Sequence, residues 1–382
     1  MAKPNSTAAP PPPPPDWPAQ AEEDYERIRV LGAGAFGQVL LGKRRPGNTH
    51  ATEEYVAIKG VSILTENEGA TAAREIAILS ELRHPNVIQL LDAYDPASDA
   101  AKGRYMVMAY IDGPDIGDLL EKRGALSLPL VRLIARDLIN AVAYLHARGV
   151  IHRDIKPDNV MLKGCKENKK WIDDDLMWTD DKACIKAIKK GRFKAILADF
   201  GFARANTYKE HERQQSRVNL RLSAVGTKNF ASPELVENVC DKDEEEQALT
   251  PCVSKYGMMS DAYSVGVTLS EIVTGVPPGN DVTTYVNANR KPMPKPQTKL
   301  SKLLGSKPKG PYPVQLRLMG ELPMPCSNLI SSLMNYDPTT RLSVREAQDH
   351  EYIGGYDTLE HGDVVSKRGS KCVPLQNIAA YR

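Results

Sequence analysis

The sequence predicts an α+β fold in which strands dominate the N-terminal part and helices dominate the C-terminal part. Short runs rich in β-branched and aromatic residues occur between residues 28 and 109, separated by glycine-containing and polar turns. One helical period interrupts them at 72–82, and longer helical periods follow at 130–148 and 260–274. A last helical stretch is expected over 329–352. Strands followed by helices in this order are typical of an α+β chain.

The composition indicates an ordinary soluble globular protein. Of the 382 residues, 41% are apolar and 26% are charged, and the formal net charge of +2 shows no bias toward nucleic acid. The six cysteines form no C-x-x-C pair and have no histidine at zinc-binding spacing, so we expect reduced thiols. No segment has the apolar length of a signal peptide or a membrane helix. We therefore expect a cytoplasmic protein, with the nucleus as the alternative, and neither nucleic acid nor membrane as a partner.

The two ends of the chain are expected to lie outside the folded part, which we place at 25–353. Residues 1–24 are rich in alanine, serine and proline, and the six consecutive prolines at 10–15 bury no surface. We expect a disordered extension that acts as a spacer, with a ligand for profilin-like or WW-type domains as the alternative. The tail 354–382 lacks a clear amphipathic period, which does not support a calmodulin-binding helix.

Two stretches inside the folded part read as surface inserts, near 163–194 and 281–312. The first mixes acidic and basic residues with Trp171 and Trp178, so it is either a surface loop or a docking element for a partner. The second is rich in lysine and proline, which favours a solvated charged run over a contact with acidic partners.

A glycine-rich turn lies between the first two expected strands. Residues Gly32 to Val39 read G-A-G-A-F-G-Q-V, and glycines at these positions let backbone amides approach phosphate oxygens closely. A dinucleotide-binding turn is the alternative, but it requires a helix directly after the last glycine, and a β-like run follows here. The pattern therefore favours a phosphate-binding flap between two strands.

The densest group of functional residues lies between Gly149 and Met161, which read G-V-I-H-R-D-I-K-P-D-N-V-M. Asp154 can accept a hydroxyl proton, and Asn159 can hold a cation that offsets the charge of a phosphate. A turn with charged residues on a solvated face is the alternative. Further along, Asp199 follows an apolar run and offers the hard oxygen ligand that a magnesium ion bridging phosphates needs.

These motifs resemble those of eukaryotic protein kinases, and they occur in the family's order across residues 25–353. The catalytic loop matches H-R-D-L-x-x-x-N with Ile155 in place of leucine, and V-A-I-K and D-F-G stand at 56–59 and 199–201. Residues 226–234, G-T-K-N-F-A-S-P-E, are similar to the end of a kinase activation segment, with Ser232 in place of alanine. The resemblance implies a bilobal protein kinase fold.

In that fold, residues 25–109 would form an N-terminal lobe with a five-stranded antiparallel sheet and one helix, and residues 114–353 a mostly helical C-terminal lobe. The cofactors would be ATP and Mg²⁺. Asp154 would orient the attacking hydroxyl, Lys156 would steady the γ-phosphate, and both Asn159 and Asp199 would hold magnesium. The positions implied for the nucleotide are Leu31, Gly32, Gly34, Phe36, Gly37, Val39, Ala57, Lys59, Glu75, Met108, Ala109, Ile111, Asp115 and Met161.

The resemblance also implies partners for several of these residues. Lys59 would grip the phosphates and pair with Glu75; Glu81 and a solvent-facing Lys59 are the alternatives. Met108 would be the gatekeeper, the backbone of Ala109 and Ile111 would bond adenine, and Asp115 would reach the ribose.

Three further pairings concern the C-terminal lobe. Glu234 would pair with Arg341. Asp261 would brace the catalytic loop, with Tyr263 where the family usually has tryptophan. Ser223 is a candidate for an activating phosphate bound by Arg153.

The resemblance implies a serine/threonine protein kinase, because a lysine stands two residues after Asp154, and the chain looks similar to the calcium/calmodulin-dependent group. We expect a monomer that acts on protein substrates and that an upstream kinase activates. Asp158 and Asp115 are candidates for reading a basic residue of the substrate. The alternatives are an inactive pseudokinase scaffold and a small-molecule kinase, although no motif residue whose loss marks a pseudokinase is missing.

Overall fold

The computed structural model describes residues 19–34, 37–47, 54–63, 65–94, 103–164, 186–188, 191, 193–205, 227–235, 253–278 and 322–354. These residues belong to two compact units, unit 1 up to Asp112 and unit 2 from Gly113 onward. No helix in the described parts of the chain is long and apolar enough to cross a membrane. Phe36, Ser223 and the insert predicted at 281–312 lie outside the described residues.

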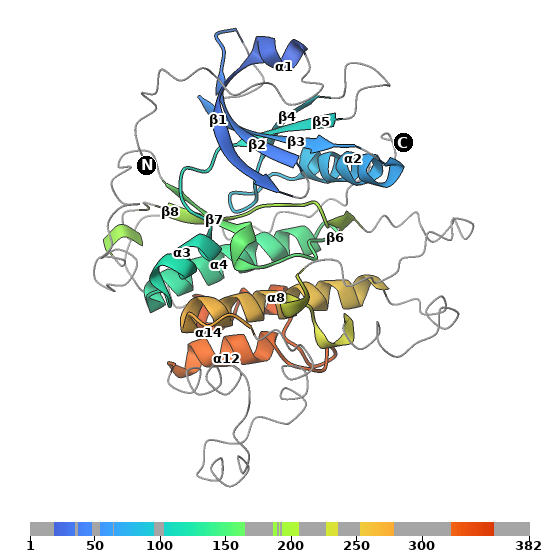
Figure 1. Ribbon diagram of the computed structural model, residues 1–382. Coiled ribbons are helices and arrows are strands. Elements are labelled where there is room, and N and C mark those ends of the chain that lie inside the picture. Colours follow the sequence, from blue (N-terminus) through green and yellow to red (C-terminus); the bar gives the residue numbers. More distant parts are fainter. Residues whose placement is uncertain are drawn as a thin grey trace, which may run out of the picture. The chain divides into compact units, whose positions relative to one another are not determined.

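Unit 1 is built on one antiparallel sheet of five strands (Figure 1). The strands in spatial order are β1 (Tyr25–Gly34), β2 (Gly37–Arg44), β3 (Tyr55–Ser62), β5 (Gly103–Ala109) and β4 (Leu90–Tyr94). β1 and β2 form a hairpin in which Gly34 pairs with Gly37, so the glycine-rich turn connects two strands as predicted. The predicted five-stranded sheet is therefore confirmed.

The helix predicted at 72–82 is present, but it begins earlier, because α2 spans Glu66–Glu81. Thr65 caps it: Thr65 Oγ1 accepts from the Glu68 N–H at 3.3 Å, and Glu68 Oε2 accepts from the Thr65 N–H at 2.9 Å. The apolar stripe used for the prediction starts only after the first turns, whereas the capping residues mark the true start. α2 lies beside β4 in unit 1 (Figure 1).

A short helix, α1 (Ala19–Asp24), precedes the sheet, so the prediction of disorder for 1–24 is wrong for 19–24. Ala21 is fully buried and belongs to one apolar cluster with residues of all five strands of the sheet. The other members of this cluster are Tyr25, Leu40, Val56, Ile58, Tyr94, Tyr105 and Val107. The Arg45 N–H also donates to the Asp24 carbonyl at 2.9 Å. The prediction for this segment rested on its proline content, which does not reveal the burial of Ala21 or the hydrogen bond between Arg45 and Asp24.

Unit 2 is mostly helical, and its long helices α4 (Leu128–His146) and α8 (Val253–Thr274) pack against each other (Figure 1). The single helical stretch predicted over 329–352 is wrong, because a turn around Asp337 and Pro338 divides it. The Asp337 carboxylate accepts from Thr339 there. The remaining helices are α3 (Ile116–Arg123), α12 (Met324–Leu333), α13 (Val344–Ala347) and α14 (Glu351–Gly354).

Two small sheets in unit 2 carry the predicted catalytic and metal-binding motifs. β6 (Val150–Ile151) pairs with β9 (Arg204–Ala205), and β7 (Val160–Gly164) pairs with β8 (Phe193–Leu197). The last two strands extend into both ends of the insert predicted at 163–194. Inside that insert, residues 186–188 form a helical turn in which Ala187 is buried.

Candidate functional site

Four of the residues assigned to the nucleotide in unit 1 share one face of the sheet. Val39 pairs with Lys59, and Ala57 pairs with Met108. Directly paired residues of neighbouring strands point to the same face, and successive residues of a strand alternate between faces. These four residues therefore lie on the face opposite to the one that packs under α1.

Lys59 forms the expected ion pair with the helix α2. Its Nζ donates to Glu75 Oε1 at 2.8 Å, and Glu75 is only 5% exposed. A buried carboxylate is costly without a cationic partner, so the pair holds the lysine side chain in a defined place. Glu81, the alternative partner, is exposed at the end of α2. The nucleotide roles of these residues stay predictions.

The other positions predicted for the nucleotide in unit 1 lie on β1, on β2, at the end of β5 and just after it. No atom lies within 4 Å of the point where a Cβ would stand at Gly32, so packing within the protein does not explain the glycine there. Open space beside a backbone amide is what an approaching phosphate requires. The Ala109 N–H donates to the Gln89 carbonyl at 3.0 Å, so this N–H is already used within the protein. Ile111, two residues further along the chain, is buried.

In unit 2 the predicted base, Asp154, is held by three neighbours. Asn159 Nδ2 donates to Asp154 Oδ2 at 2.9 Å, and the Thr227 N–H donates to Asp154 Oδ1 at 3.0 Å. Lys156 Nζ lies 3.3 Å from Asp154 Oδ2 and donates to Thr227 Oγ1 at 2.9 Å. The carboxylate is almost fully buried, and these contacts fix its orientation for a proton acceptor.

Asp261 of α8 supports the catalytic loop by binding its backbone. Its carboxylate accepts from the N–H groups of His152 at 2.8 Å and Arg153 at 2.9 Å, and it lies 3.0 Å from His146 Nε2. Burial favours a raised pKa for Asp261, but the His146 contact and the His152 N–H outweigh it and lower the pKa. Arg153 has φ of +72°, a conformation unfavourable for a residue other than glycine. The two acceptor bonds of Asp261 stabilise it.

The two predicted metal ligands lie at the same end of the β7–β8 hairpin. Asn159 directly precedes β7 and Asp199 follows β8, with Val160 paired to Leu197 and the Ala198 N–H bonded to the Asn159 carbonyl at 2.8 Å. Both side-chain contacts of Asn159 use Nδ2, which leaves Oδ1 for a cation. The described residues contain no group of three or more His, Cys, Asp or Glu that could hold a metal ion. Two oxygen ligands completed by phosphates and water suit Mg²⁺, so these residues fit that ion.

Two residues predicted to bind the nucleotide, Asp115 and Met161, form contacts within the protein. Asp115 caps α3, because its Oδ1 accepts from the Asp118 N–H at 2.7 Å, and burial raises its pKa. Met161 lies on β7 and forms a bridge to Asp115. The prediction missed Thr227, although the G-T pair before the activation-segment end was visible. It also missed His146 on α4, for which the sequence offered no signal.

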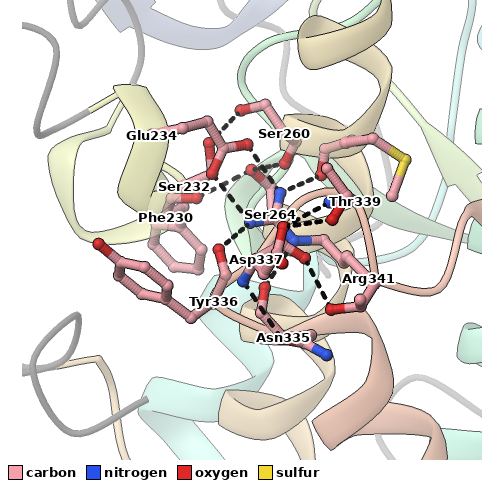
Figure 2. A network of polar contacts seen from close by, with 12 residues as sticks. Phe230, Ser232, Glu234, Ser260, Ser264, Asn335, Tyr336, Asp337, Thr339 and Arg341 are labelled. Atoms are coloured by element: carbon pink, nitrogen blue, oxygen red, sulfur yellow. Dashed lines mark hydrogen bonds and ion pairs between the residues drawn. The ribbon is translucent and has the colours of Figure 1, made fainter. Parts of the chain in front are cut away.

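Glu234 and Arg341 form the predicted ion pair, shown in Figure 2. Arg341 donates to both carboxylate oxygens, at 2.7 Å and 2.8 Å, and also to three backbone carbonyls. Its guanidinium carbon lies 5.0 Å from the centre of the Tyr263 ring, a cation–π contact. Ser232, which stands where the family has alanine, donates to Ser260 Oγ at 2.9 Å. The substituted serine thus adds a buried bond between the activation segment and α8.

Curated proteins of several organisms are similar to the chain. Serine/threonine-protein kinase 36 of Pongo abelii is 28% identical over 340 residues, which are 88% of this chain and 20% of that protein. Probable serine/threonine protein kinase IRE4 of Arabidopsis thaliana is 26% identical over 88% of this chain and 28% of that protein. The chain thus spans less than a third of these relatives. Calcium/calmodulin-dependent protein kinase type 1 of Caenorhabditis elegans is 25% identical over 95% of this chain and 83% of its own length.

A solved structure and a family model agree with these relatives. The crystal structure of the Rad53 kinase domain and SCD2 matches with a TM-score of 0.54 and 18% identity, over 87% of this chain and 90% of that one, which shows the protein kinase fold. The family model for the protein kinase domain matches residues 25–353. Together with the catalytic loop, the D-F-G segment and the two ion pairs, this match shows that the chain belongs to the protein kinase family.

Proposed function

We propose that the protein transfers the γ-phosphoryl group of ATP to serine or threonine hydroxyls of protein substrates. The observation that carries the proposal is the group of Asp154, Asn159, Lys156 and Thr227, in which the predicted base is oriented by direct hydrogen bonds. The proteins named as serine/threonine kinases among the similar proteins support the substrate class. An inactive scaffold would have no need to keep this geometry.

Each side chain has a stated task in this proposal. Asp154 accepts the proton of the substrate hydroxyl, and its contacts with Asn159 and Thr227 aim it. Lys156, already bonded to Thr227, places a positive charge where the transferred phosphoryl group develops negative charge. When bound, Mg²⁺ neutralises phosphate charge, and Asn159 and Asp199 would hold it. In unit 1, Lys59 grips the nucleotide phosphates while Glu75 keeps it in place.

We also propose that unit 2 prefers substrates with a basic residue near the acceptor hydroxyl. Asp158 is exposed in the catalytic loop, and it repels the carboxylate of Glu271 on α8 electrostatically. Burial and the charge of Asp158 together raise the pKa of Glu271 to about 7, and Glu271 Oε2 is buried without a hydrogen-bond partner. An arginine or lysine of a peptide beside the exposed Asp158 would relieve the repulsion between the two carboxylates. Asp115, the other predicted reader, is occupied as a helix cap.

Regulation and location belong to the proposal as well. The pairing of β6 with β9 places Arg204 opposite Ile151, close in sequence to Arg153, which supports a binding place for a phosphate added to Ser223 by an upstream kinase. We propose a monomeric cytoplasmic enzyme on the basis of the composition. Imaging of a tagged full-length protein and light scattering of the purified protein test these two points.

The test of the central proposal is phosphate transfer from ATP and Mg²⁺ to a serine/threonine peptide pool. Asp154→Asn should lower kcat by roughly 100-fold or more, since a positioned base contributes that much, and Asp199→Asn should lower activity at limiting Mg²⁺. Asp349→Asn, an exposed change in the same unit, is the control and should leave the rate unchanged. A wild-type protein that binds ATP but transfers no phosphate, even after activation by an added kinase, would refute the proposal and support an inactive scaffold.

A further inference from the structure

Asp137 is a buried carboxylate of α4 that takes no part in the proposed transfer. It is 3% exposed and surrounded by the apolar residues of a packed helix. Burial of an ionised carboxylate is costly unless hydrogen bonds compensate it. Asp137 Oδ1 accepts from Arg136 Nε at 3.0 Å and Nη2 at 2.9 Å, and Oδ2 accepts from the Ala195 N–H at 2.9 Å. One oxygen therefore binds a cation and the other binds the backbone of a distant strand.

The amide that Asp137 binds lies in the middle of β8. Within the described chain, β8 has a partner strand on one edge only, β7, where Ala195 pairs with Leu162. Ala195 is buried, so its N–H needs a partner inside the protein. The Asp137 carboxylate provides it, which ties β8 to the side of α4. In effect, the carboxylate takes the place that a third strand would occupy.

β8 leads directly to the metal ligand. Asp199 follows the strand after Ala198, whose N–H bonds to the Asn159 carbonyl. At the other end of the hairpin, β7 and β8 are joined by residues 165–192 rather than by a tight turn. A long connection restrains two strands less than a short one does. A second anchor on β8 is therefore valuable for keeping Asp199 in register with Asn159.

We propose that Asp137 is a positioning residue that fixes β8 on α4 and thereby keeps Asp199 beside Asn159 for a divalent cation. Asp137 touches neither the cation nor the nucleotide, and it acts through the Ala195 amide. The inference rests on the proposed function in one respect, that Asn159 and Asp199 bind the metal of the nucleotide.

Two substitutions separate positioning from mere stability. Asp137→Leu keeps the side-chain size and removes both acceptors, while Asp137→Asn keeps one acceptor for Ala195. The matched control is Asn140→Leu, on the same helix: Asn140 Oδ1 accepts from Gln348 Nε2 at 2.9 Å, away from β8. All three are made in the full chain. Melting temperature, amide exchange at Ala195 and binding of Mn²⁺ in the presence of ADP are measured for each.

In Asp137→Leu we expect at least tenfold faster exchange of the Ala195 amide and roughly tenfold weaker Mn²⁺ binding, the size seen when supporting contacts of metal ligands are removed. Asp137→Asn should show a smaller loss of the same kind, and it decides the matter if the leucine variant does not fold. Asn140→Leu should lower the melting temperature without weakening Mn²⁺ binding. In transfer assays, the Mg²⁺ concentration for half-maximal rate should rise in the Asp137 variants.

Two results would overturn the positioning role: Mn²⁺ binding by the Asp137 variants at wild-type strength, or equal weakening in Asn140→Leu. These are distinct from failure of the proposed function. A wild-type protein that binds Mn²⁺ and ADP but transfers no phosphate would refute the function and leave the role of Asp137 measurable. A wild-type protein that binds no Mn²⁺ would refute both.

Discussion

Breaking the ion pair between Glu234 and Arg341 tests how much this pair stabilises the end of the activation segment in unit 2. The Arg341 side chain is fully buried and that of Glu234 is 13% exposed. Removing one partner of a buried pair typically costs about 3–5 kcal/mol, because a charge stays buried without compensation. Glutamine keeps one acceptor oxygen, and three backbone carbonyls still accept from Arg341. We therefore expect Glu234→Gln to lower the free energy of unfolding by about 3 kcal/mol.

For a unit of this size, a loss of that order corresponds to a melting temperature lower by about 10 °C. Urea unfolding and calorimetry of the full-length protein measure it, and peptide phosphorylation should fall in parallel, since the activation segment is no longer tied to α8. Asp337→Asn is the control: this carboxylate lies near Arg341 but is exposed and bonds only to Thr339. If Glu234→Gln melts within about 2 °C of the wild type, the pair contributes little and the reasoning is wrong.

Three further changes have defined outcomes. Tyr94→Phe removes the hydroxyl that lies 2.7 Å from Asp24 Oδ2, so it should cost about 2 kcal/mol in urea unfolding and make α1 sensitive to limited proteolysis; resistance equal to the wild type would contradict it. Asp261→Asn should lower kcat about 100-fold with little change in KM, because the strained Arg153 loses an acceptor for its N–H. A normal kcat would show that the catalytic loop keeps its conformation without the Asp261 carboxylate. Glu271 binds its proton more tightly in the folded state, so the unfolding free energy should fall by on the order of 1 kcal/mol as pH rises from 4.5 through about 7. Glu271→Gln should flatten this fall and weaken any preference for basic peptides, and an unchanged profile would exclude the group.

Local chemistry explains which parts of the fold and site the sequence could predict. Lys59, Asp154 and Asp199 stand in short motifs whose spacing dictates their role, so their elements and the Lys59–Glu75 pair were predictable. Asp137 was not, because an aspartate beside an arginine on a helix reads as a solvated pair, and only the position of β8 reveals its burial. The helix α1 was missed for a similar reason, since one buried alanine decides its packing.

The polar residues of α8 show why a periodic stripe describes that helix incompletely. The helical period at 260–274 implies one buried face, yet every residue from 260 to 270 is buried. Two of the polar ones are tolerated because each bonds to a segment that needs a partner: Asp261 binds the catalytic loop, and Ser264 Oγ donates to the Phe230 carbonyl at 2.8 Å. From the C-terminal side, Arg341 donates to the Met259 carbonyl at 2.7 Å. Catalytic loop and activation segment are thus oriented by the same helix, so loosening α8 should disturb Asp154 and Thr227 together rather than either alone.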